Sequence, residues 1–117
     1  GDVPDVFYKS THKNHPSTIW ARSKAGNYRW LYDLFVSLCD EYTYRYGKVH
    51  LSDKKFRASL LSHPRNISFG DYIQPPQCMP DEYKCDDSVT AYRNYYMGDK
   101  AYFAKWSKRD EPKWWNV

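Results

Sequence analysis

A chain of 117 residues is large enough for one modest hydrophobic core, so we expect a single domain over residues 1–117. Aromatic residues make up 19% of the chain and aliphatic residues are scarce, so the core must be built largely from rings. No apolar run approaches the roughly eighteen residues of a membrane-spanning helix, and we expect no membrane contact. The three cysteines lack a regular spacing, which favours reduced thiols over a disulfide framework.

The net charge of +4 is unevenly spread along the chain. Residues 6–32 carry five basic side chains and no acidic one, and residues 48–70 carry five basic side chains against one acidic one. Residues 71–90 reverse the balance with five acids against one base, whereas residues 91–117 have six bases against three acids. Basic zones around an acidic loop favour an anionic partner, although an ordinary solvated surface is equally compatible with this pattern.

The N-terminal part is predicted to contain an extended arm and one short helix. Residues 1–14 include a few β-prone side chains but show no lasting period, so we expect an arm there. Pro16 suits the first turn of a helix, and the pattern predicts a helix over Pro16–Lys24. Ala25 and Gly26 are expected to separate this helix from the next one.

The longest run without glycine or proline predicts a central helix over Asn27–Tyr46. Its apolar residues recur at intervals of three and four, which places them on one stripe of the helix. The stripe consists of Trp30, Leu31, Leu34, Phe35, Leu38 and Tyr42. Asn27 is a suitable N-cap, and Gly47 stands where a left-handed residue commonly ends a helix. We expect the rest of the chain to pack around this helix.

A third helix is predicted over Ser52–Ser62, with Ser52 as its N-cap. The following residues 64–87 are predicted to form a coil, because they contain four prolines and no helical period. A coil of this length is uncommon in a small domain, and we expect it to wrap tightly on the body of the domain.

A fourth helix is predicted over Ser88–Met97, with Asp87 or Ser88 as its N-cap and Gly98 as an interruption. Its expected inner stripe contains Val89, Tyr92, Tyr95 and Tyr96. Residues 107–117 form an aromatic tail. No strand–turn–strand pattern is present, so the predicted fold is mainly α: a compact single-domain helical bundle around one long central helix, with a long proline-rich coil before the last helix.

A dense group of polar and aromatic residues lies at the end of the central helix. Glu41 and Arg45 are four residues apart and share one helix face, and His50 follows shortly afterwards. The pattern is compatible with an ion pair beside the core, and also with a polar helix end that faces a ligand.

A second group interleaves tyrosines with basic side chains. It contains Tyr92, Arg93, Tyr95, Tyr96 and Lys100. Rings of this kind can stack on nucleobases while cations contact phosphates, so we predict that the group binds DNA together with Arg22 and Arg29. Tyrosines at intervals of three and four are also compatible with a helix core, and we expect at least one of the three to be buried there.

The sequence gives little indication of a metal or cofactor site. His12 and His15 are three residues apart and Cys78 and Cys85 are seven apart, but neither spacing is that of a common zinc finger or ribbon. No glycine-rich phosphate loop or serine nucleophile elbow occurs in the chain. We therefore expect neither a bound metal nor a cofactor.

The segment Tyr92-Arg93-Asn94-Tyr95-Tyr96, followed by Gly98 and Lys100-Ala101, is similar to the tyrosine-rich Gly-Lys-Ala motif of the phage pyrimidine-dimer DNA glycosylases of the endonuclease V type. The central helix, the proline-rich connection and this motif come in the matching order. The chain also resembles a group of phage proteins through the segments HPSTIWARS, EYTYRYGK and SVTAYRNYY, a likeness that implies no activity.

The first resemblance implies a small helical DNA-repair enzyme, a glycosylase and abasic-site lyase that flips a damaged base out of the duplex. In that family an N-terminal amine attacks the sugar and a glutamate on the first helix assists. Residues 1–14 contain no helix signal and no glutamate, so we expect this chain to lack an upstream catalytic segment and to be inactive alone. The alternative is a non-enzymatic phage protein that binds a protein partner or a second copy. The expected location is the cytoplasm of an infected bacterium, or the virion.

Overall fold

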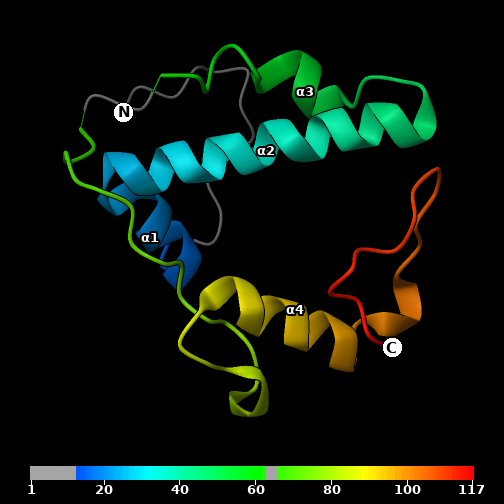
Figure 1. Cartoon of the computed structure of the whole chain (residues 1–117). Helices are drawn as coiled ribbons and strands as arrows, with labels where there is room; N and C mark the ends of the chain where they lie inside the picture. The colour runs from blue at the N-terminus through cyan, green and yellow to red at the C-terminus, as the bar shows by residue number, and fades with distance from the viewer. Residues whose placement is uncertain (1–12, 63–65) are drawn as a thin grey trace. The chain divides into compact units, whose positions relative to one another are not determined.

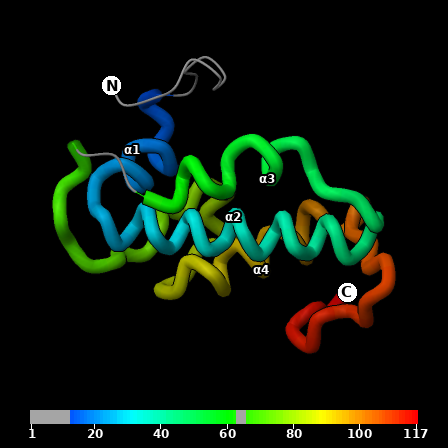
Figure 2. The backbone as a smooth tube through the Cα atoms, turned by 90° about the horizontal axis from the view of Figure 1, so that it is seen from above, coloured from blue at the N-terminus to red at the C-terminus, as the bar shows by residue number. Residues whose placement is uncertain are grey.

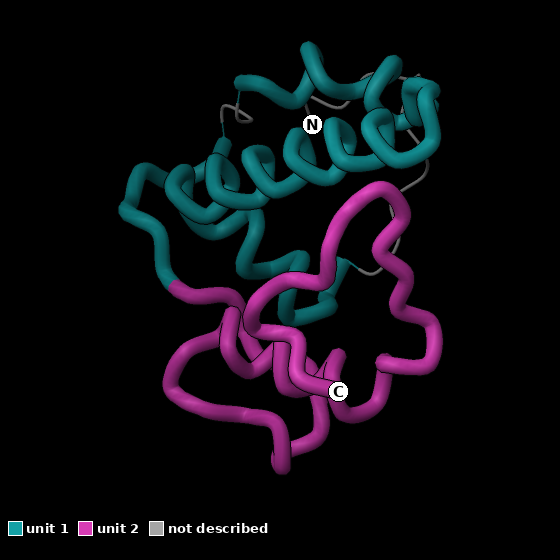
Figure 3. The backbone as a smooth tube through the Cα atoms, turned by 45° about the vertical axis from the view of Figure 1, so that its right-hand side comes forward, with its two compact units in different colours: residues 1–73 teal, residues 74–117 magenta. Residues whose placement is uncertain are grey.

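The described residues, 13–62 and 66–117 of a computed structural model, are mainly helical and include no strand (Figure 1). The mainly α fold class predicted from the sequence is therefore confirmed. The chain divides into two compact units, Gly1–Ile73 and Gln74–Val117, which are described in turn (Figure 3). Residues 1–12 of the predicted arm lie outside the described part of the chain, and the single domain stays a prediction.

In the first unit, two helices meet at Lys24. α1 covers Pro16–Ser23 and α2 covers Ala25–Tyr46, so the predicted bounds are right to within two residues. Lys24 between them adopts an extended conformation, with φ −146° and ψ 146°. The break is therefore at Lys24 and not at Ala25-Gly26, and α2 includes both of those residues.

The start of α2 is held by the segment 66–73. The N–H groups of Ala25 and Gly26 donate to the carbonyl oxygens of Ser68 and Gly70 at 2.8 and 2.9 Å. A helix start leaves its first backbone donors without an intrahelical partner, and two of them are satisfied here by another segment. This arrangement replaces a side-chain cap.

Asn27 is not the N-cap of α2, as predicted, but its third residue, and it is only 1% exposed. Its amide group donates to the carbonyl oxygen of Trp20 at 3.0 Å, and its Oδ1 accepts a hydrogen bond from the N–H of Ile73 at 2.8 Å. One buried side chain thus joins α1 and α2 to the last residue of the unit.

The predicted apolar stripe of α2 is only partly buried. Trp30 packs against Trp20 and Tyr72, with ring centroids 5.7 and 5.6 Å away. Three leucines of the stripe stay exposed: Leu31, Leu34 and Leu38. The period identifies residues on a common face, but only the tertiary fold determines whether another element covers that face.

Tyrosine hydroxyls attach α2 to the residues that follow α3. Tyr28 donates to the carbonyl oxygen of Leu60 at 2.8 Å, and Tyr32 donates to that of Arg57 at 2.6 Å. Cys39 is buried on α2, and burial is the main cause that raises the pKa of its thiol. Rings with satisfied hydroxyls thus supply the packing that aliphatic side chains give in most cores.

α3 covers only Leu51–Phe56 and lies along α2 (Figure 2). The prediction of a helix over Ser52–Ser62 is therefore wrong beyond Phe56, where turns follow instead. The N-cap is His50, whose Nδ1 accepts a hydrogen bond from the N–H of Ser52 at 3.0 Å. Ser52 is thus inside the helix and not its cap.

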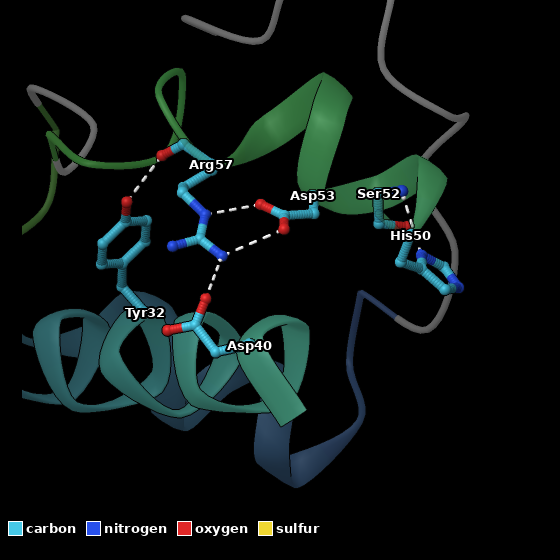
Figure 4. A network of polar contacts seen from close by, with 6 residues as sticks. All are labelled: Tyr32, Asp40, His50, Ser52, Asp53 and Arg57. Atoms are coloured by element: carbon cyan, nitrogen blue, oxygen red, sulfur yellow. Dashed lines mark hydrogen bonds and ion pairs between the residues drawn. The ribbon is translucent and has the colours of Figure 1, made fainter. Parts of the chain in front are cut away.

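Arg57, at the end of α3, pairs with one carboxylate of α3 and one of α2, and the second pair connects the two helices (Figure 4). Its guanidinium pairs with Asp53 one turn earlier, and with Asp40 of α2 at 2.7 Å. The hydrogen bond from Arg57 holds the pKa of the Asp53 carboxyl below its usual range. The same bond, with a smaller contribution from Asp40, raises the pKa of Arg57.

We expect acid to destabilise the first unit partly through Asp53. Because its pKa is lowered in the folded state, Asp53 contributes stability above the usual aspartate value of about 4 and loses it as the pH falls through the lower folded-state value. Asp53→Asn should therefore lose less unfolding free energy between about pH 7 and about pH 3, measured by urea unfolding. Asp33→Asn, on the exposed surface of α2, is the control. Equal acid sensitivity of Asp53→Asn and the unchanged chain would contradict this assignment.

The second unit is built on α4, which covers Ser88–Asp99. Two short 3-10 turns flank it, η1 over Asp81–Tyr83 and η2 over Ala101–Phe103. The side chain of Asp87 caps α4, as predicted, by accepting a hydrogen bond from the backbone N–H three residues later. The helix continues through Gly98, so the predicted interruption there is wrong.

Small residues are the most buried part of α4. Ala91 is fully buried and Ser88 is 2% exposed. Val89 and Tyr96, which were predicted for the inner stripe, are exposed. The coil thus approaches α4 closely over its small side chains and leaves part of its aromatic surface open to solvent.

Two glutamines of the coil attach it to the start of α4. The amide of Gln74 donates to the carbonyl oxygen of Asp86 at 3.0 Å and accepts from the N–H of Ser88 at 2.6 Å. The amide of Gln77 pairs in the same way with both backbone groups of Cys85. The two prolines between the glutamines favour a polyproline helix with three residues per turn, which brings both side chains to one face.

Candidate nucleic-acid interface

The residues predicted to bind DNA fall into two groups. Arg22 and Arg29 belong to the first unit. The other five belong to α4, or follow it directly, in the second unit: Tyr92, Arg93, Tyr95, Tyr96 and Lys100.

Arg22 and Arg29 are exposed but have partners within the first unit. Arg22, in the last turn of α1, donates to the carbonyl oxygen of Lys13. Arg29 pairs with Asp33 one turn later on α2 at 3.1 Å, and both side chains are more than half exposed. An exposed ion pair such as that of Arg29 contributes about 1 kcal/mol or less, so Arg29 could exchange Asp33 for an anionic ligand at little cost.

Tyr92 stabilises the second unit through hydrogen bonds of its hydroxyl to the proline-rich coil. Its hydroxyl donates to the carbonyl oxygen of Pro76 at 2.8 Å and accepts a hydrogen bond from the N–H of Cys78 at 3.2 Å. The ring is half-buried beneath the coil. Of the three predicted tyrosines, this one attaches the proline-rich coil to α4.

Arg93 and Lys100 each lie over an aromatic ring. The guanidinium carbon of Arg93 is 4.8 Å from the ring centroid of Trp114, and Nζ of Lys100 is 5.5 Å from that of Tyr95. Exposed contacts of this type contribute roughly 0.5–1 kcal/mol. Neither cation forms an ion pair within residues 13–62 and 66–117, so both keep their charge available for an anion.

Five rings of the second unit form a continuous series of contacts, which we name the aromatic row. In order of contact they are Tyr83, Tyr95, Tyr96, Phe103 and Tyr102. Successive centroids lie between 5.4 and 6.1 Å apart, the usual distance for interacting rings. Sequence reasoning missed Phe103 and Tyr102 as site residues, because they lie beyond both the predicted helix and the tyrosine motif.

The inner end of the aromatic row is fixed by Tyr83. A Cβ at Gly98 would overlap its ring, so the glycine allows Tyr83 to lie directly on α4. The hydroxyl donates to Oδ1 of Asp99 at 2.7 Å. This hydrogen bond is the main cause that raises the pKa of Tyr83 to about 12. The row therefore begins on a ring held at two points.

The polar residues at the end of α2, Glu41, Arg45 and His50, make contacts within the first unit that stabilise the fold. Nε of Arg45 donates to Oε2 of Glu41 at 2.7 Å, and both side chains are largely covered. The ring of His50 contacts Tyr42 edge-on with centroids 4.8 Å apart, while its Nδ1 caps α3 (Figure 4). These contacts agree with the ion pair beside the core that the sequence left open as one interpretation.

The other predicted features give no further site in the described part of the chain. No group of three or more potential metal ligands is found among residues 13–62 and 66–117. Of the two predicted histidines, His12 lies outside these residues, and His15 caps α1 through its Nδ1. No helix of the described segments is long and apolar enough to cross a membrane.

Comparisons with protein-family models, with curated proteins and with solved structures find no match to the chain. The resemblance to the phage DNA glycosylases therefore stays a prediction from the tyrosine motif.

Proposed function

We propose that the chain is a DNA-binding protein and that it binds through the aromatic row and the adjacent cations. The observation that carries the proposal is the exposed aromatic surface of α4 and η2 next to Lys100. Rings can stack on bases while a lysine or arginine contacts phosphate, a combination found in proteins that bind nucleic acid. The resemblance of the Tyr92–Ala101 segment to a DNA-repair motif supports the same proposal.

The charge distribution limits how much of this binding is electrostatic. Residues 74–117 contain seven basic and seven acidic side chains, so their net charge is zero. Some of the acids are engaged within the unit, since Asp81 pairs with Lys84 and Asp87 caps α4. Only a few phosphate contacts are therefore available, and stacking must supply a large share of the affinity.

DNA repair in an infected bacterial cell is the more specific form of the proposal, and the motif resemblance is its support. A lyase of this kind joins an amine to the aldehyde of an abasic site with loss of water, and borohydride reduces the resulting imine to a stable bond. A covalent adduct with abasic DNA would support an enzyme. Binding without an adduct would favour a non-enzymatic DNA-binding protein.

A protein-interaction role is the second candidate, because α2 carries exposed leucines. Leu31 and Leu34 are 40% exposed and Leu38 is 61% exposed, all on one side of the helix. Connected apolar surface of this kind is typical of protein-binding sites. Light scattering after size exclusion separates the candidates, because a self-associating face should give a dimer that Leu38→Ser returns to a monomer.

We expect affinity for duplex DNA to fall about ten- to fortyfold between 50 and 200 mM salt, as two or three ionic contacts would require. Lys100→Ala should bind DNA more weakly and should show a smaller salt slope, measured by fluorescence anisotropy. Lys54→Ala removes the same charge from α3 and is the matched control. Equal losses for the two variants would contradict the site, and no binding to any DNA at low salt would contradict the function.

A further inference from the structure

The outer end of the aromatic row is unusually open. Tyr102 is 84% exposed, Phe103 is 53% exposed and Tyr96 is 45% exposed. Their centroids are 5.4 Å apart between Tyr102 and Phe103, and 6.1 Å apart between Phe103 and Tyr96. Single exposed rings are common on soluble proteins, but three rings in contact form an apolar patch. We name these three rings the platform.

The backbone beneath the platform is ordered by two hydrogen bonds. In η2 the N–H of Phe103 donates to the carbonyl oxygen of Lys100 at 3.3 Å, and the N–H of Ala104 donates to that of Ala101 at 3.1 Å. The rings are therefore presented by a defined turn and not by an extended segment. Binding on such a surface loses less conformational entropy than ordering a loop would.

A cation lies next to the platform. Nζ of Lys100 is 5.5 Å from the ring centroid of Tyr95, and Tyr95 contacts Tyr96 edge-on at 6.1 Å. One ring thus separates the ammonium group from the platform. Rings flanked by a cation can bind a nucleotide, because the base stacks on the apolar rings and the phosphate contacts the positive charge.

We propose, on the basis of the DNA-binding function above, that the platform stacks unpaired nucleobases of single-stranded or locally opened DNA. Bases within a duplex are stacked on their neighbours and present only their edges in the grooves, so an exposed ring cannot stack on them without opening the helix. The zero net charge of residues 74–117 supports the same choice, because a duplex has the denser phosphate charge and depends more on cations.

The test compares a fluorescent single-stranded oligonucleotide with a duplex of the same sequence. Tyr102→Ala should weaken binding of the single strand at least about fivefold, since one stacking contact is lost, and should change duplex binding less. Tyr102→Phe keeps the ring and should bind like the unchanged chain. Phe69→Ala removes a 91% exposed ring from the first unit and is the matched control. Circular dichroism checks that each variant is folded.

The outcomes separate this inference from the function on which it rests. Equal binding of single strand and duplex, with no loss in Tyr102→Ala, would overturn the platform and leave DNA binding intact. Equal losses in Tyr102→Ala and Phe69→Ala would also overturn it. No binding of either DNA form would overturn both proposals. A monomer–dimer equilibrium that Tyr102→Ala abolishes, without DNA binding, would assign the platform to a protein partner.

Discussion

Asn27→Ala should lower the free energy of unfolding by about 3 kcal/mol. The side chain is 1% exposed, and the substitution removes its hydrogen bonds to Trp20 and Ile73. The carbonyl of Trp20 keeps a bond from the hydroxyl of Ser23, but the N–H of Ile73 loses the partner that Asn27 supplies. The hydrogen bond from Ile73 is part-buried, and a donor left there without an acceptor costs about 1–3 kcal/mol, while the small cavity left by the buried amide of Asn27 adds to this.

Urea unfolding followed by far-ultraviolet circular dichroism measures the change. Asn66→Ala is the matched control, because Asn66 is an exposed asparagine of the same unit. A change in unfolding free energy of less than about 1 kcal/mol in both variants would show that Asn27 does not join α1, α2 and Ile73 as described.

Two signals that depend on a few neighbouring residues were predicted correctly from the sequence. Gly47 ends α2 in the left-handed conformation with φ 68°, and Asp87 caps α4. Both follow from local rules for helix ends, which need no tertiary information. His15 and His50 cap their helices with a ring nitrogen, and propensity rules do not rank histidine among the preferred caps.

Features that depend on distant segments could not be predicted. Asn27 looks like a cap because an asparagine precedes the apolar pattern, yet the carbonyls of Ser68 and Gly70, some forty residues away, move the helix start back to Ala25. The exposure of Leu38 likewise depends on which elements cover α2, and periodicity carries no information about this.

For the same reason, only a part of the candidate site could be predicted from the sequence. The tyrosine motif pointed to α4, but Tyr92 is used by the coil through its bonds to Pro76 and Cys78. The contact between Arg93 and Trp114 joins α4 to the aromatic tail and follows from no local pattern. Rings alone cannot reveal which of them face solvent, because the same residue types build the core of this chain.

The proposed DNA binding therefore rests on the rings of the aromatic row that are exposed to solvent. Burial of a ring stabilises the folded state by about 25 cal/mol for each Å² of apolar surface removed from water, and an exposed ring contributes little of this free energy. Tyr102 is 84% exposed and therefore contributes almost none of this stabilisation. Tyr83 of the same unit, in contrast, packs on Gly98 and donates a hydrogen bond to Asp99. A ligand that covers the outer rings would bury this apolar surface and gain the corresponding free energy on binding. An unpaired base has the flat apolar face that such a contact requires.

Among the glycines that the structure describes, Gly26→Ala should be the most destabilising change, at about 3 kcal/mol or more. A Cβ at Gly26 would overlap the backbone nitrogen of Tyr72 and lie 2.8 Å from the carbonyl oxygen of Gly70. Backbone atoms cannot move aside as a side chain can. The clash would also break the hydrogen bond from the N–H of Gly26 to Gly70, which holds the start of α2.

Two other glycines provide the controls for this prediction. A Cβ at Gly98 would displace the ring of Tyr83 and break its hydrogen bond to Asp99, a loss of about 0.5–1.5 kcal/mol, but alanine is favoured over glycine within a helix by up to about 1 kcal/mol. Gly98→Ala should therefore change the free energy of unfolding by less than about 1 kcal/mol. Gly47→Ala meets no atom but strains a φ of +68°, which costs about 1–2 kcal/mol. Urea unfolding should rank the three losses in the order Gly26, Gly47, Gly98, and a Gly26→Ala variant as stable as Gly98→Ala would show that the segment 66–73 does not cross the start of α2.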